Sequence, residues 1–163
     1  MLISNWTCNC LPAVIHVLQS IGIITFLSGQ IGSNEHDDME RLSQGLCAYL
    51  LGNLIIGNDN SVSNYTQEEL MQLIEKRIGI EIFLDKLSEV SKHEAYNRAL
   101  KHPQIKCLKP GDLILDHSFC QLFKVSFIME IINYFICYGG FSKQASQIIF
   151  CLFGELSLNF GDF

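Results

Sequence analysis

A chain of 163 residues is the size of one domain, with room for a single hydrophobic core. Its formal net charge is −6, and Lys and Arg alternate with acidic residues, which argues against nucleic acid as a partner because phosphates require a basic surface. Seven scattered cysteines, with no Lys or Arg before Arg41 to start a signal peptide, argue against a secreted disulfide framework. We therefore expect reduced thiols in the cytoplasm.

The first two expected helices lie within residues 11–31. Pro12 suits the first turn of a helix, and one apolar face follows at helical spacing, formed by Leu11, Val14, Ile15 and Leu18. Gly22 marks a break. After it a second apolar face follows, formed by Ile24, Leu27 and Ile31.

A longer helix is predicted to start near Asp37, since Asp37 and Glu40 have the spacing of a capping box. Its apolar stripe is broad and consists of Met39, Leu42, Leu46, Cys47, Leu50, Leu51, Leu54 and Ile55. A helix that is polar at its start and apolar nearly all round later usually enters a core. The segment 57–61, which is rich in Gly, Asn and Asp, predicts its end.

Three further helices are predicted from capping patterns. Thr66 and Glu69 form a capping box for a helix that Gly79 closes, with Leu70, Ile74 and Ile78 on its apolar side. The next helix turns Phe83, Leu87 and Val90 inward and Glu81, Asp85 and Glu89 outward. Ser91 and Glu94 match a second capping box, which predicts a short helix through Leu100.

Asp116 can cap a last helix that carries Phe119, Leu122 and Phe123. No segment before residue 125 alternates with the period of a strand, so the expected fold is all-α. Helical spacing alone does not distinguish a compact bundle from stacked solenoid pairs.

Four short patterns were weighed as sites of chemistry. Cys8 and Cys10 lack a second pair of ligands at zinc-site spacing. His117 and Cys120 form at most half of a zinc site, and we expect a solvated imidazole beside a buried thiol. The run of His36, Asp37 and Asp38 lacks the alternating ligands of a calcium loop. Gly139 and Gly140 have no Lys-Ser/Thr after them to form a phosphate loop. We therefore expect no catalytic residue, no metal site and no cofactor.

Several blocks together resemble the general vesicular transport factor family, the Golgi vesicle-tethering proteins. They are FLSGQIG (26–32), GLCAYLLG (45–52), NDNS (58–61), QLIEKRIG (72–79), the KL..VSKHE.Y.RA run (86–99) and LDHSF (115–119). The resemblance covers roughly residues 8–124 and points to the end of the globular head.

The resemblance implies an armadillo-like α-solenoid fragment without enzymatic activity. It implies a cytoplasmic protein, peripheral on the Golgi membrane, that acts in endoplasmic reticulum-to-Golgi and intra-Golgi transport. The implied partners are a Rab-type GTPase, golgins, a subunit of the conserved oligomeric Golgi complex and SNAREs. The blocks that hold Lys76, Arg77, Lys92, His93 and Glu94 carry the likeness and are our expected partner-binding residues.

The family's charged, dimerising coiled coil does not follow residue 124. Residues 125–163 instead hold seven of the eleven Phe and only four charged residues. We expect two units, a head segment at 1–124 and an atypical apolar tail at 125–163. Our hypothesis for the tail is translation of a retained intron.

Two alternatives stay open for the whole chain. One is a small tail-anchored membrane protein, although Glu130 and Asn133 lie inside the segment 125–141, which is short for a span. The other is a truncated isoform without function. A metal-dependent enzyme that uses Cys8, Cys10 or His117 is the weakest hypothesis.

Overall fold

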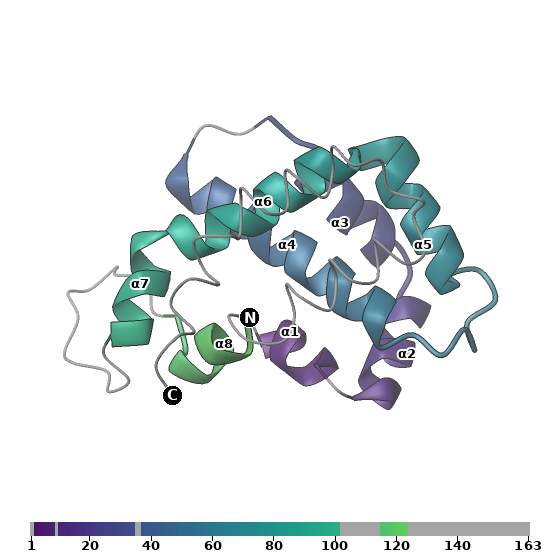
Figure 1. Cartoon of the computed structure of the whole chain (residues 1–163). Coiled ribbons are helices and arrows are strands. Elements are labelled where there is room, and N and C mark those ends of the chain that lie inside the picture. The colour runs from purple at the N-terminus through teal and green to yellow at the C-terminus, as the bar shows by residue number, and fades with distance from the viewer. Residues whose placement is uncertain (1, 9, 35–36, 102–114, 124–163) are drawn as a thin grey trace, which may run out of the picture.

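The computed structural model describes residues 2–8, 10–34, 37–101 and 115–123, and within these ranges every regular element is helical. The elements are α1 (Leu2–Thr7), α2 (Leu11–Gln19), α3 (Ile23–Ile31), α4 (Asp38–Ile56), α5 (Gln67–Leu73), the π-helical turn η1 (Ile74–Ile78), α6 (Ile80–Lys92), α7 (Glu94–Lys101) and α8 (His117–Leu122). The all-α prediction is confirmed for this part of the chain. Its packed helical layers are those of an armadillo-like fragment (Figure 1). The tail at 125–163 lies outside the described residues.

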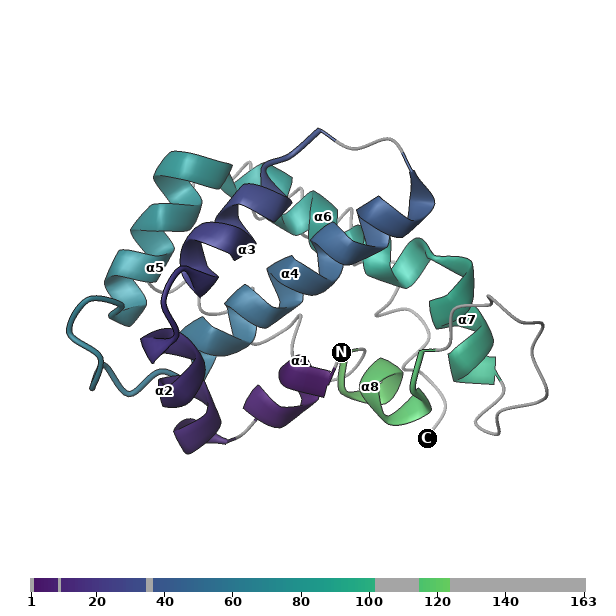
Figure 2. The same ribbon diagram turned by 180° about the vertical axis from the view of Figure 1, so that it is seen from behind.

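Helix α4 is the centre of the molecule and contacts α1, α2, α3, α5 and α6 (Figures 1 and 2). The sequence explains this position, because α4 is apolar on nearly every side after its first turn. Its residues Leu51 and Leu54 are fully buried, and Tyr49 is buried with them. The predicted entry of this helix into a core is confirmed.

The closest helix contact joins α4 to α6 at Gly45. A Cβ added there would lie 2.4 Å from Val90 Cγ2 and 2.6 Å from the Lys86 carbonyl oxygen. No real side chain fits at these distances, so the absence of a Cβ sets how closely the two helices pack.

The predicted helix starts at Asp37, Thr66 and Asp116 are confirmed. Asp37 and Thr66 each form a complete capping box, and the Asp116 carboxylate accepts the Ser118 N–H at 3.3 Å. The helix that begins at Gln67 ends in a wider form than predicted, since the Gly79 N–H donates to the Ile74 carbonyl across a π turn at 2.8 Å. Gly79 leaves this turn with φ of 89°, which favours glycine.

The predicted capping box at Ser91 is wrong. The Ser91 hydroxyl donates to the Ser88 carbonyl at 2.7 Å within α6, so α6 continues to Lys92. His93 separates α6 from α7 and provides the cap for α7 instead.

Two apolar faces were also predicted incorrectly in part. Leu11 and Leu122 are exposed by 40% and 37%, and Ile15 is only half-buried. Ala13 and Val17 are buried in α2. The buried face of this helix is therefore rotated relative to the face that includes Leu11. Cys120 is buried in α8 beside Phe119.

Helix α8 is attached to the core by aromatic rings. Phe119 and Phe123 are fully buried, and their ring centroids lie 5.4 Å and 5.1 Å from that of Tyr49. Tyr96 of α7 adds a hydroxyl that donates to the Cys120 carbonyl at 3.3 Å. A six-residue helix has little stability of its own, so this cluster holds it in place.

Among the described helices, none taken singly has both the length and the apolar character to cross a membrane. The pair α2 and α3, bent by 89° at its break, meets those two criteria only when both helices are counted together.

Candidate protein-docking groove

A groove of about 460 Å³ lies where three helix ends meet: the start of α4, the end of α6 and the start of α7. It is lined by Asp38, Met39, Arg41, Leu42, Glu89, Lys92, His93, Glu94, Ala95 and Arg98. The two parts of this lining are far apart in sequence and meet because α4 packs along α6.

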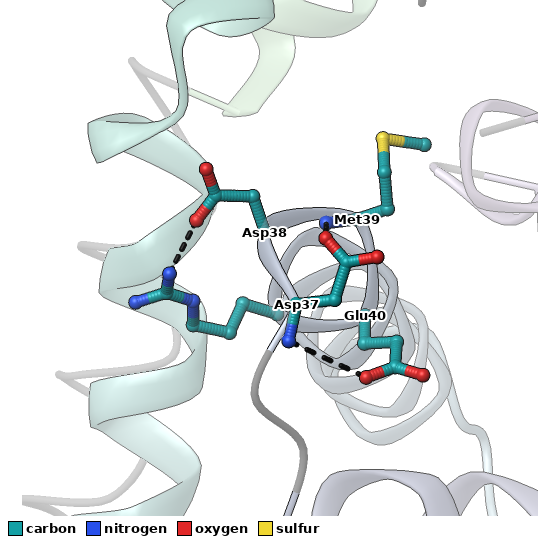
Figure 3. A network of polar contacts seen from close by, with 5 residues as sticks. Asp37, Asp38, Met39 and Glu40 are labelled. Atoms are coloured by element: carbon teal, nitrogen blue, oxygen red, sulfur yellow. Dashed lines mark hydrogen bonds and ion pairs between the residues drawn. The ribbon is translucent and has the colours of Figure 1, made fainter.

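The α4 wall depends on the cap at Asp37 (Figure 3). The Asp37 carboxylate accepts the Met39 N–H at 3.2 Å, and the Glu40 carboxylate accepts the Asp37 N–H at 3.4 Å. This cap fixes the first turn, from which Asp38 pairs with Arg41. Met39 is 49% exposed and lies beside the buried Leu42, so the wall offers apolar surface next to charge.

The opposite wall turns at His93. The ring atom Nδ1 of His93 accepts the Ala95 N–H at 3.1 Å, and the His93 carbonyl accepts the backbone N–H groups of Tyr96 and Asn97. The Asn97 side-chain amide then bridges back to the Ser91 carbonyl at 3.2 Å. These bonds satisfy donors that the first turn of α7 would otherwise leave without a partner.

Three ion pairs surround the groove, and each lies within one helix. Arg41 pairs with Asp38, Lys92 with Glu89 at 2.8 Å, and Arg98 with Glu94 at 3.1 Å. Charges of both signs therefore alternate in the lining, together with the apolar residues Met39, Leu42 and Ala95. Exposed pairs of this kind are weak, so a partner can replace one member at little cost.

Three of the five expected partner-binding residues line this groove, namely Lys92, His93 and Glu94. Lys76 and Arg77 lie apart from them, exposed in η1 at the other end of α6, about 20 Å away for a helix of this length. Partner binding by all five stays a prediction.

Sequence reasoning missed Asp38, Met39, Arg41 and Arg98 as lining residues. The predicted apolar stripe of α4 was wrong at Met39, which is 49% exposed, and no sequence pattern marked this residue as part of a groove.

The lining holds no hydroxyl or thiol nucleophile, and Nδ1 of its one imidazole already serves as a cap. Within the residues that the structure describes, no cluster of three or more His, Cys, Asp or Glu could hold a metal ion. The groove thus presents charged and apolar side chains at a surface formed by three helix ends.

The other sequence candidates are not brought together as a site. Nδ1 of His117 lies 2.9 Å from the Ala99 carbonyl oxygen, so this half-buried ring is bound to the backbone of α7 and is less solvated than expected. Burial raises the pKa of the Cys120 thiol to about 11, with Asp116 adding to the effect, and this keeps it a poor nucleophile at neutral pH. Cys8 and Cys10 are half-buried. His36, Gly139 and Gly140 lie outside the described residues.

Comparison with protein families shows the family of the chain. The family described as "Uso1 / p115 like vesicle tethering protein, head region" matches residues 1–132. The chain belongs to this family. Three members named "General vesicular transport factor p115" are similar to it over 124 residues, with identities of 51% in Mus musculus, 50% in Rattus norvegicus and 49% in Homo sapiens.

Each of these alignments covers 76% of the chain and 13% of the relative, so the chain spans a small part of the length of the p115 proteins it matches. The resemblance drawn from the sequence blocks is therefore confirmed. The fold is that of a segment of a Uso1/p115-like head, and a groove lined by helix ends is a feature of that segment.

Proposed function

We propose that this chain acts as a non-enzymatic docking scaffold in vesicle tethering between the endoplasmic reticulum and the Golgi and within the Golgi. Membership of the Uso1/p115-like head family carries the proposal. The groove between α4, α6 and α7 supports it, because it combines an exposed apolar side chain with charged groups that can exchange partners.

The proposed partners are those that the family resemblance implies: a Rab-type GTPase, golgins, a subunit of the conserved oligomeric Golgi complex and SNAREs. Lys92, His93 and Glu94 form the proposed contact surface together with Arg41 and Arg98. Lys76 and Arg77 are proposed as a second, separate contact. The proposed location is the cytoplasm, peripheral on the Golgi membrane. Residues 1–124 are the proposed docking unit, and residues 125–163 a separate tail.

A binding assay with the full chain tests this function. The immobilised protein is presented in turn to a purified GTP-loaded Rab-type GTPase, a golgin, an oligomeric Golgi complex subunit and a SNARE. We expect saturable binding of at least one of them. If a correctly folded chain binds none of the four, the docking proposal is wrong.

A charge-matched pair of variants locates the contact. Arg41→Glu with Arg98→Glu changes the groove, and Lys76→Glu with Arg77→Glu changes η1 by the same net charge. We expect the groove variant to weaken binding by at least about tenfold, as loss of charge-assisted contacts does. Loss of binding in both variants would agree with two contacts. Full binding by the groove variant would exclude the groove as a contact surface.

A further inference from the structure

His93 has a structural role in the fold besides its place in the proposed contact surface. It is the single residue between α6 and α7, it lines the groove, and its ring atom Nδ1 accepts the Ala95 N–H at 3.1 Å. An imidazole nitrogen accepts a hydrogen bond only while it carries no proton. The cap of α7 therefore requires the neutral ring with its hydrogen on Nε2.

From this geometry we infer that His93 is a proton-sensitive hinge: acidification abolishes its cap, loosens the first turn of α7 and changes the shape of the groove. A proton on Nδ1 turns the acceptor into a donor that faces the donor of Ala95. The imidazolium also places positive charge at the N-terminus of a helix, where the helix dipole opposes it. Both effects act in the same direction.

The charged groups around the ring do not offset this change. α4 contributes Asp38 and Arg41, α6 contributes Glu89 and Lys92, and α7 contributes Glu94 and Arg98. Each carboxylate is already paired with the cation of its own helix. The groove is neutral in sum before the proton arrives, so the proton gives it a net positive charge.

The change reaches beyond the groove because α7 is attached to α8. Tyr96 follows Ala95, its ring centroid lies 5.6 Å from that of Phe123, and its hydroxyl donates to the Cys120 carbonyl. A looser first turn of α7 thus weakens the packing of α8 on the core.

His117 is a natural contrast within the same layer. Its Nδ1 faces the Ala99 carbonyl at 2.9 Å, so it must carry the hydrogen and donate it. A second proton on this ring leaves that donor in place. Nε2 of His117 lies 3.3 Å from the side-chain nitrogen of Gln121, and a second proton would remove this contact within α8 while the bond to α7 stays. The two histidines hold α7 at opposite ends, and protonation removes the bond to α7 at only one of them.

Amide hydrogen exchange of the full chain, followed by NMR, tests the hinge. Exchange is measured at about pH 7.5 and at about pH 5.5, the range in which imidazoles titrate. The rates are compared as protection factors, because these remove the effect of pH on the intrinsic exchange rate. We expect the protection of the Ala95, Tyr96 and Asn97 amides to fall about fivefold on acidification, the factor that one helix cap is worth. Amides in the middle of α4 should not change.

Three variants decide the cause. His93→Asn keeps a neutral cap acceptor and should lose the pH response, whereas His93→Ala should show the low protection at both pH values. His117→Gln should respond as the native chain does. A native chain without the fall, a fall of equal size in His93→Asn, or loss of the response in His117→Gln would each overturn the inference.

Regulation of docking by this hinge rests on the proposed function, but the exchange measurement needs no partner. A chain that binds its partners without the pH response refutes the hinge alone. A chain with the response that binds nothing refutes the docking function alone. If both proposals hold, acid should weaken binding in the native chain and leave binding by His93→Asn unchanged.

Discussion

The two parts of this molecule are stabilised in different ways. Residues 1–34 contain no Asp, Glu, Lys or Arg, and neither α2 nor α3 starts with a side-chain cap. From Asp37 onward, α4, α5 and α8 start with capping side chains, and ion pairs lie along α4, α6 and α7. The first part therefore depends on burial of apolar side chains against α4, while the second also encodes its helix ends locally.

Exposed apolar side chains follow the same division. Ile21 is fully exposed at the turn between α2 and α3, and Trp6 and Phe26 are more than half exposed. In the second part, the apolar lining residues of the groove lie among charged side chains. The difference shows that one small fold can combine a surface that only apolar contacts can cover with one that can select a partner by charge.

The largest expected effect is in the uncharged part. Leu27 of α3 is 2% exposed, and we expect Leu27→Ala to lower the free energy of unfolding by about 2–5 kcal/mol because it leaves a cavity that nothing else offsets. Urea denaturation measures the loss, which should be the same at low and high salt. A loss below about 1 kcal/mol would show that packing is not what holds α3.

The next largest effect concerns glycine-to-alanine substitutions at two helical positions, which should change stability in opposite directions. A Cβ at Gly45 would overlap Val90 and the Lys86 carbonyl, so Gly45→Ala should destabilise by about 1–3 kcal/mol. Gly29 in α3 has nothing within 4 Å of an added Cβ, and Gly29→Ala should stabilise by about 0.5–1 kcal/mol. Thermal unfolding of both variants makes the comparison, and shifts of the same sign would contradict the close α4–α6 contact.

A smaller effect tests whether the second part encodes its helix ends. Thr66 accepts the Glu69 N–H at 3.2 Å, so Thr66→Ala should cost about 1 kcal/mol. Ser20, exposed at the end of α2, donates its hydroxyl only to the His16 carbonyl, and Ser20→Ala should stay within about 0.5 kcal/mol of the native chain. Equal losses in urea denaturation would remove the distinction between the two parts.

The smallest effect concerns the charges of the groove. In the Arg98–Glu94 pair the Glu94 side chain is 86% exposed, and Glu94→Gln should cost only about 0.3–0.5 kcal/mol. Most of that difference should disappear in about 1 M salt, where the screening length is short. A larger loss that resists salt would show that this pair is structural and not available to a partner.

The features that could be predicted from the sequence are those made by residues close together in the chain. The capping boxes at Asp37 and Thr66 are complete within four residues, so they are visible without tertiary structure. The same pattern at Ser91 misleads, because α6 continues past it to Lys92 and the Ala95 N–H bonds to His93 instead. A histidine cap such as His93 is rare enough that no simple pattern marks it.

The groove could not be predicted, since Met39 and Arg98 become neighbours only when α4 packs on α6. Helical periodicity also leaves the orientation of a short apolar helix open. In α2 it correctly placed Val14 and Leu18 inward, but it favoured Leu11 and Ile15 where Ala13 and Val17 are buried.

The π-helical turn at Ile74–Ile78 has a consequence for how this chain can vary. Such a turn holds one residue more than the α-helical turn that would join the same two ends. Ile74 and Ile78 stay buried while the residues between them project outward. Loss of one of those outward residues would therefore shorten the turn and leave α6 in register. Insertions and deletions among homologous tethers should be tolerated at this turn, while the helices on either side keep their length.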